Sequence, residues 1–377
     1  MKKQLSVLCI SIFCLCASVL VAQENTVYRD TIPFRNDLGL IIVPITFNGE
    51  EKEFVFDTGA QVTLAYSWAS TELRKTRKTM TVTSSSGLKS KMRLYKSGTI
   101  QFASRKITGH RILNTPQNEI FICHQVDGIL GVDIIKRFNW TIDYENKILI
   151  MHPPDYFPDQ LSDMFALDFD FKNNRPYVFL KHKDASFKFV LDTGAGRTSN
   201  ISRRNYDLTT IDDYPQATFY SGSYDVNGIF TNSKPIVFQF ADAISKDVLL
   251  SPMMNYNDSK STKIANSLWR GKQLFLSLEQ DKLYVSEAKI EEHKKGYPCA
   301  VSMREGKMVI TSLQEGSDLW NEGLRQGDEI QWYDGKTFDD FCTLDKYQRN
   351  LFQSGASFEI QLDNGKTFTI SRQALFD

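Results

Sequence analysis

The sequence predicts a mainly β protein with two tandem lobes of similar size, followed by a smaller C-terminal domain. Three observations lead to this prediction. The phrase "FVFDTGAQ" at residues 54–61 returns as "FVLDTGAG" at residues 189–196, a shift of 135 positions. The apolar stretches around both phrases have the length of strands and are bounded by turn residues. A charged stretch with Gly296 and Pro298 then separates a third region.

Length and composition are those of an ordinary globular protein with several domains. A chain of 377 residues fits roughly two or three domains of usual size. Hydrophobic residues make up 41% and charged residues 24%, which argues against general disorder. The 45 basic and 45 acidic residues balance, without a long basic run, so nucleic acid is not an expected partner.

Residues 1–22 predict a secretory signal peptide. Lys2 and Lys3 precede an uncharged apolar stretch over residues 5–21, and Ala22 supplies a small residue at the cleavage point. The alternative is a retained membrane anchor, because the stretch reaches the length of a spanning helix. We therefore expect an exported protein, periplasmic or extracellular, that is membrane-associated if the segment is retained.

Three cysteines remain once this segment is removed: Cys123, Cys299 and Cys342. Their spacing matches neither a metal clip nor a C-x-x-C redox pair. Buried free thiols are the favoured state, and a bridge between Cys299 and Cys342 is the alternative.

The first lobe is expected over residues 23–155. A strand, an Asn48-Gly49 turn and a second strand lead to Asp57. Further on, "GILGVDIIKRFNWTIDYENKILIM" predicts a buried strand, a short helix and a hairpin that turns at residues 145–147.

The second lobe is expected over residues 165–287, after a proline-containing linker at residues 156–164. The 135-residue shift places "IIVPITFNGEEKEFVFDTGA" on "PYVFLKHKDASFKFVLDTGA" without a gap. A later stretch, "IANSLWRGKQLFLSLEQDKLYV", repeats the end of the first lobe with its glycines lost.

The repeated phrase needs more than chance or turn chemistry to explain it. Asp and Gly alone could form strand-to-turn corners, but this leaves the repeated Thr and the apolar triplets unexplained. The duplicated apolar-Asp-Thr-Gly-Ala phrase, with Ile129-Leu130-Gly131 after the first copy, resembles aspartic proteases of the pepsin and retropepsin type. The resemblance covers residues 38–285. It implies a mainly β fold, one catalytic aspartate from each lobe, Asp57 and Asp192, and a cleft between the lobes.

The same resemblance gives roles to the rest of each phrase. Thr58 and Thr193 would brace the two loops against each other, and Gly59 and Gly194 would let the backbone approach the carboxylates. Ile129-Leu130-Gly131 would pack behind the first loop, with Ile264-Ala265-Asn266 as its counterpart. Two carboxyls held close together share one proton and so provide an acid and a base.

Ala60 and Ala195 stand where acid-acting relatives carry Ser or Thr. A hydroxyl there would donate to the carboxylate and lower its pKa. Without it we expect a working pH nearer neutral than strongly acid.

A substrate would lie extended across the cleft under a flap. Ser85 and Gly87 have the composition of a flap tip in the first lobe. Tyr220 and Tyr224 are the expected lining residues in the second.

Residues 288–377 are expected to form a linker and a small separate domain. "EGSDLWNEGLRQGDEIQWYDGKTF" is similar to the PDZ pattern, with a helix start at Ser317, a glycine stop at Gly323 and a strand before the Asp334-Gly335 turn. The resemblance implies binding of a peptide or chain terminus, with Gly296 and Tyr297 as candidates for the ligand loop.

These expectations combine into an exported aspartic endopeptidase that acts on polypeptides as a monomer with an internal pseudo-dimer. No cofactor is expected. The five histidines, His110, His124, His152, His182 and His293, show no metal-ligand spacing, so no metal is expected. The alternatives are a catalytically inactive peptide-binding protein, with Asp192 misplaced by weaker support, and a scaffold in which the PDZ domain leads.

Overall fold

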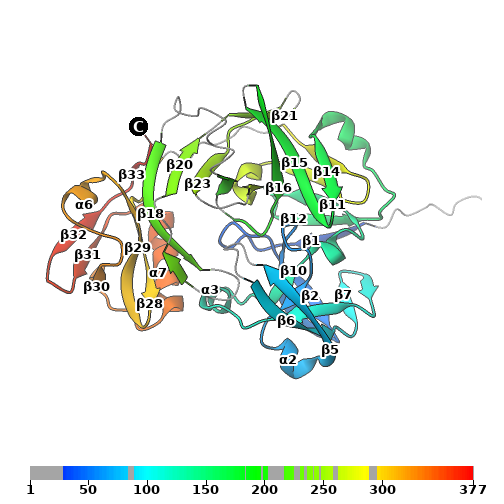
Figure 1. Ribbon diagram of the computed structural model, residues 1–377, viewed down its shortest axis with the longest axis horizontal. Helices are drawn as coiled ribbons and strands as arrows, with labels where there is room; N and C mark the ends of the chain where they lie inside the picture. The colour runs from blue at the N-terminus through cyan, green and yellow to red at the C-terminus, as the bar shows by residue number, and fades with distance from the viewer. Residues whose placement is uncertain are drawn as a thin grey trace, which may run out of the picture.

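The structure is a computed structural model that describes residues 29–83, 89–182, 184–196, 198–202, 216–224, 230–232, 236–240, 242–245, 248–257, 262–287 and 295–376. The expected signal peptide, with its alternative as an anchor, lies outside the described residues. Strands dominate, and Figure 1 shows two lobes on the right and a C-terminal domain on the left. Within the described residues, no helix combines the length and apolar character needed to span a membrane.

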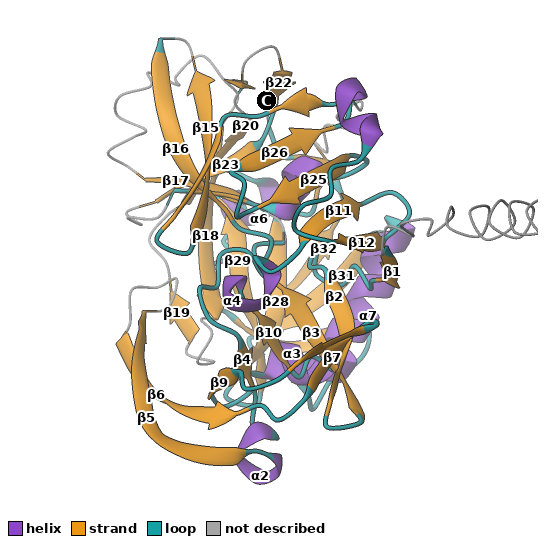
Figure 2. Ribbon diagram, turned by 90° about the vertical axis from the view of Figure 1, so that its right-hand side faces the viewer, coloured by secondary structure: helices purple, strands orange, loops and turns teal. Residues whose placement is uncertain are grey.

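Lobe 1 is built on a nine-stranded sheet in the order β5-β6-β9-β4-β10-β3-β2-β7-β8. The predicted turn joins β2 to β3 and places Asn48 at φ +52° and Gly49 at φ +101°. Figure 2 shows β5 and β6 as a long curved hairpin that reaches away from the lobe. The elements are β1 (Asp30–Pro33), β2 (Ile42–Phe47), β3 (Glu50–Phe56), β4 (Leu64–Ala65), α2 (Ala69–Glu72), β5 (Arg74–Thr83), β6 (Lys89–Lys96), β7 (Ile100–Phe102), β8 (Arg105–Ile107), β9 (Arg111–Asn114), α3 (Glu119–Cys123), β10 (Gly128–Leu130), α4 (Val132–Ile135), β11 (Asn139–Asp143) and β12 (Ile148–His152).

Lobe 2 repeats the central part of this plan. The β15–β16 hairpin corresponds to β2–β3, and β24 pairs in parallel with β16 as β10 does with β3. A 3₁₀ turn, η1 (Asp159–Asp163), lies in the connection between the lobes. The elements are β13 (Phe165–Ala166), β14 (Phe169–Lys172), β15 (Arg175–His182), β16 (Ala185–Leu191), β17 (Ser199–Ser202), β18 (Gln216–Tyr224), β19 (Phe230–Asn232), β20 (Ile236–Phe240), β21 (Ala243–Ser245), β22 (Val248–Leu250), β23 (Met253–Asn257), β24 (Lys263–Ile264), η3 (Asn266–Trp269), β25 (Gln273–Ser277) and β26 (Lys282–Val285).

A six-stranded sheet joins the two lobes, in the order β1-β12-β11-β25-β26-β13. At its centre β11 of lobe 1 pairs antiparallel with β25 of lobe 2, and Trp140 lies opposite Leu276. Both side chains are fully buried, within one hydrophobic core that extends through both lobes. Burial of such a shared apolar surface fixes the lobes relative to each other.

The C-terminal domain has a separate core around Tyr333 and Phe358. As predicted, Ser317 caps a helix by accepting from the backbone N–H of Trp320, and Gly323 follows that helix at φ +100°. The elements are β27 (Lys295–Gly296), β28 (Cys299–Arg304), β29 (Lys307–Gln314), α6 (Asp318–Asn321), β30 (Glu329–Tyr333), α7 (Phe341–Ser354), β31 (Phe358–Leu362), β32 (Thr367–Ile370) and β33 (Gln373–Ala374).

A strand pairing and a disulfide are among the contacts that attach this domain to the lobes, and the sequence predicted neither. Strand β18 of lobe 2 pairs antiparallel with β29, so the sheet of lobe 2 continues into the domain. A disulfide joins Cys123, at the end of α3 in lobe 1, to Cys342 in α7. Figure 1 shows α3 beside α7 at this junction.

The cysteine prediction was therefore wrong for two of the three residues. Cys123 and Cys342 are bonded across 219 positions, whereas Cys299 is a buried free thiol as expected. The alternative bridge between Cys299 and Cys342 is also wrong. The reason is that tertiary packing, and not sequence spacing, brings α3 against α7.

Candidate active site

Each repeated phrase forms a loop at the carboxyl end of an equivalent strand. Asp57 follows β3 and Asp192 follows β16. The backbone N–H of Asp57 donates to the carbonyl of Leu130 at 3.0 Å, and that of Asp192 donates to the carbonyl of Ile264, also at 3.0 Å. The apolar triplets before both aspartates are largely buried, which anchors the loops in the cores of their lobes.

The structure brings the two aspartates together across the lobes. A Cβ atom built on Gly59 would lie 2.5 Å from Oδ1 of Asp192, and one built on Gly194 would lie 2.2 Å from Cγ of Asp57. Such distances leave no room for a side chain. Each glycine therefore makes space for the carboxylate of the opposite lobe.

The two threonines link the loops reciprocally. The backbone N–H of Thr58 donates to Oγ1 of Thr193 at 2.9 Å, and that of Thr193 donates to Oγ1 of Thr58 at 3.1 Å. Each hydroxyl in turn donates to a carbonyl of the opposite lobe, Leu191 for Thr58 at 2.6 Å and Phe56 for Thr193 at 2.7 Å. Both threonines are fully buried, so these bonds form away from water.

The second loop is supported from behind in the same way as the first. Behind the first loop, the N–H of Val132 donates to the carbonyl of Ala60 at 2.8 Å; behind the second, the N–H of Asn266 donates to the carbonyl of Ala195, also at 2.8 Å. The Asn266 amide also donates to the carbonyl of Thr193 at 2.6 Å. The loss of glycines that suggested weaker support is thus compensated by an amide side chain.

A lysine that the sequence interpretation missed lies at this site. Nζ of Lys263, on β24, is 3.1 Å from Oδ2 of Asp192. The register of the repeat could have revealed it, because Lys263 precedes Ile264 as Ile129 precedes Leu130.

The surroundings of Asp57 disfavour its charged form. Burial and the nearby charge of Asp192 raise the pKa of Asp57 to about 7, against opposing hydrogen bonds from the N–H groups of Gly59 and Ala60. The same loop leads to Tyr66, which is buried, and burial with the charge of Asp57 raises the pKa of its phenol. The working pH nearer neutral that was expected from Ala60 and Ala195 stays a prediction.

Of the residues expected to cover or line the cleft, the structure describes the side chain of Tyr220. Ser85 and Gly87 lie outside the described residues, and so does the side chain of Tyr224. Tyr220 pairs with Leu313 of β29, and its ring stacks on Trp320 of α6 at a centroid distance of 5.0 Å. The structure therefore gives Tyr220 a contact with the C-terminal domain that the sequence did not predict.

The residues expected in a PDZ ligand loop take part in the packing of their own domain. Gly296 lies in β27 opposite Gln373, and the hydroxyl of Tyr297 donates to the carbonyl of Ala356 at 2.8 Å. Between β28 and α7, Nε2 of Gln348 donates to the carbonyl of Val301 at 3.1 Å. A peptide added to this edge of β28 would have to displace that bond, and ligand binding here stays a prediction.

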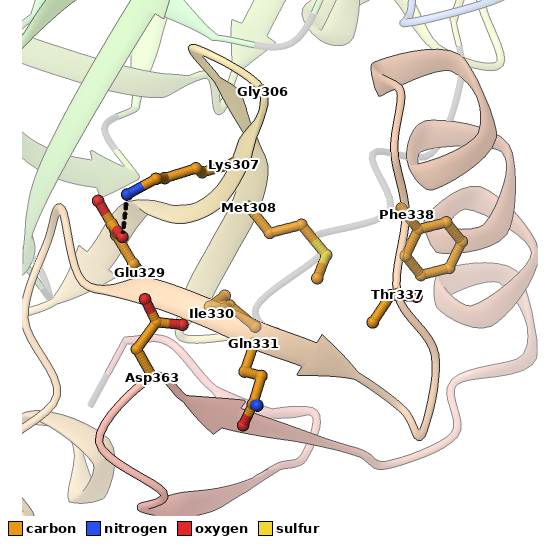
Figure 3. A pocket seen from close by; sticks show the side chains of 9 residues that line it. All are labelled: Gly306, Lys307, Met308, Glu329, Ile330, Gln331, Thr337, Phe338 and Asp363. Atoms are coloured by element: carbon orange, nitrogen blue, oxygen red, sulfur yellow. Dashed lines mark hydrogen bonds and ion pairs between the residues drawn. The ribbon is translucent and has the colours of Figure 1, made fainter.

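A pocket of about 280 Å³ lies in the C-terminal domain, away from the aspartates. Figure 3 shows Lys307 and Glu329 paired at one side of it, at 2.6 Å, with Met308 and Phe338 among the lining side chains. In the part of the chain that the structure describes, no group of three or more His, Cys, Asp or Glu side chains could hold a metal ion.

Comparison with known proteins gives one family match, over part of lobe 1. Residues 43–134 match the aspartyl protease family. Among solved structures, the crystal structure of basic 7S globulin from soybean is similar at 11% identity and a TM-score of 0.42, covering 70% of this chain and 96% of that chain. A search of curated proteins gives no significant match. The family match includes Asp57 and ends before Asp192.

Proposed function

We propose that this protein is an exported aspartic endopeptidase in which Asp57 and Asp192 activate water to cleave peptide bonds. The observation that carries the proposal is the meeting of the two loops, in which Gly59 and Gly194 each pack on the carboxylate of the opposite lobe. The aspartyl protease match over residues 43–134 supports the same reading of the first loop.

The chemistry needs one proton for two carboxyls. The ionised carboxylate takes a proton from water as the water oxygen attacks the peptide carbonyl carbon, and the protonated carboxyl gives its proton to the carbonyl oxygen. The resulting neutral diol then collapses. Its hydroxyl returns a proton to one carboxylate while the other carboxyl protonates the leaving nitrogen, which restores the starting state.

The substrate is an extended polypeptide, and the chain acts as a monomer because it supplies both loops itself. The C-terminal domain, proposed as a PDZ domain, binds a substrate or regulatory peptide. Export is supported by the apolar N-terminal segment and by the disulfide, since disulfides persist in oxidising compartments.

The test uses the mature protein, beginning at residue 23, with a mixture of denatured proteins across a range of pH. We expect cleavage by the wild type and a loss of at least about a hundredfold in both Asp57→Asn and Asp192→Asn. Thermal melting of both variants checks that they fold.

The rival function is peptide binding on the same fold without turnover. Absence of cleavage by a folded wild type at every pH would favour this rival. Unchanged cleavage in either variant would remove the carboxylate pair from the mechanism.

A further inference from the structure

We propose that Lys263 is a positioning residue for the carboxylate pair, and that its ammonium group assigns Asp192 as the base and Asp57 as the acid. The proposal rests on the proposed function, because it concerns the division of labour within that site.

The first support is the position of the lysine. Strand β24 carries Lys263 and pairs with β16, so that Lys263 lies opposite Val190, two residues before Asp192. On its other side, Lys263 lies opposite Asn200 of β17. Its backbone is thus held between two strands of lobe 2. The side chain is 20% exposed and that of Asp192 is 15% exposed, so the ion pair is screened far less than one on the surface.

The second support is the difference between the lobes. The equivalent position in lobe 1 is Ile129, which lies opposite Val55 in the same register and packs on an apolar cluster. An ammonium group at such a place is costly to bury unless it is paired. Lobe 2 therefore carries a cation, Lys263, where lobe 1 carries the apolar Ile129, and the cation contacts the carboxylate of its own lobe.

This asymmetry decides where the shared proton resides. The ammonium group is in contact with Asp192, and a cation beside a carboxylate stabilises its negative charge. The charge of Lys263 and the backbone hydrogen bonds from Gly59 and Ala60 favour the ionised form of Asp57, but burial and the charge of Asp192 outweigh them and favour its protonated form. Asp192 then takes the proton from water, and Asp57 supplies the proton to the carbonyl oxygen.

The charge state of the lysine is consistent with this role. Burial alone would lower the pKa of Lys263, but the charge of Asp192, a hydrogen bond to it and the charge of Asp57 raise that pKa above its ordinary value. Tyr66 lies near enough to Asp57 to be influenced by its charge, and burial with that charge raises the pKa of the phenol, so Tyr66 stays neutral.

The test compares Lys263→Met, Lys263→Arg and wild type in their pH profiles of kcat/KM on a peptide substrate. Loss of the cation makes both carboxyls harder to ionise. In Lys263→Met we therefore expect both limbs of the profile to move to higher pH, by roughly one unit. Lys263→Arg should keep the wild-type profile. The matched control is Lys188→Met, an exposed lysine on β16, the strand that precedes Asp192, and it should leave the pH profile unchanged.

A second readout does not depend on turnover. In Lys263→Met the carboxyls lose their counter-charge, so the difference in Tm between wild type and this variant should grow as pH rises from 4 to 8. Superimposable profiles and a pH-independent Tm difference would overturn the role of Lys263, even if the Asp→Asn variants are inactive. If the wild type does not cleave, the proposed function fails, and the Tm series alone then decides whether Lys263 controls the charge of the pair.

Discussion

The carboxyl of Asp57 is held in surroundings that favour its neutral form, and this has a consequence for stability. In an unfolded chain an aspartate ionises near pH 4, whereas in the folded protein the pKa of Asp57 is raised to about 7. The folded state therefore binds the proton more tightly. The stability from this group is fully present below about pH 4 and is lost as the pH rises through about 7.

Asp57→Asn should remove this loss, because an amide does not ionise. We expect the variant to gain Tm relative to the wild type as the pH rises from 4 to 8, with the difference levelling off above about pH 7. Calorimetry across this range measures it. Asp155→Asn, which changes an exposed aspartate outside the pair, is the control. A Tm difference for Asp57→Asn that does not vary with pH would contradict the raised pKa.

At the scale of single residues, the site residues that occur in both copies of the repeat could be predicted from the sequence, and a site residue that occurs in only one copy could not. Asp57 and Asp192 are found because the two phrases align without a gap, and the structure brings them together. Lys263 was missed because it stands where the repeat is degraded. A departure from an internal repeat carries no pattern of its own to interpret, although here the departure places a cation beside Asp192.

The two active loops depend on each other through hydroxyl groups that water does not reach. Thr58→Val keeps the shape of the side chain but leaves the carbonyl of Leu191 and the N–H of Thr193 without these partners. Each unsatisfied buried group costs about 1–3 kcal/mol. We expect a lower Tm and faster hydrogen exchange at the Thr193 amide.

Thr58→Ser is the matched variant, since it retains the hydroxyl and loses only a methyl group. It should protect the Thr193 amide nearly as well as the wild type. Equal exchange rates in Thr58→Val and Thr58→Ser would show that the hydroxyl does not hold the loops together.

Among elements, the strands of the hairpins around each loop could be predicted from their apolar runs and turns, as the β2–β3 hairpin shows. The pairing of β18 with β29 could not. Each strand presents an edge within the sheet of its own domain, and any two such edges could pair. Which of them do pair depends on how the domains pack against each other. The stacking of Tyr220 on Trp320 belongs to the same contact and was equally invisible in the sequence.

At the scale of the whole molecule, the disulfide between Cys123 and Cys342 links lobe 1 to the C-terminal domain. Removing the link in Cys342→Ser should lower the stability by about 3 kcal/mol, and a reductant should lower the Tm of the wild type to that of the variant. Scanning calorimetry with and without dithiothreitol measures this. Cys299→Ala is the control: its Tm should still fall on reduction. A wild type insensitive to reductant would contradict the bond.

Together with two strand pairings, the disulfide between Cys123 and Cys342 connects the two lobes and the C-terminal domain in a closed ring. Lobe 1 is joined to lobe 2 by the pairing of β11 with β25, lobe 2 to the C-terminal domain by the pairing of β18 with β29, and that domain back to lobe 1 by Cys342 and Cys123. Each of these three domains is joined to both of the others. One domain therefore cannot rotate about a single connection while the other two connections stay unchanged. A motion of the lobes that separates Asp57 from Asp192 would therefore strain both strand pairings and the disulfide together.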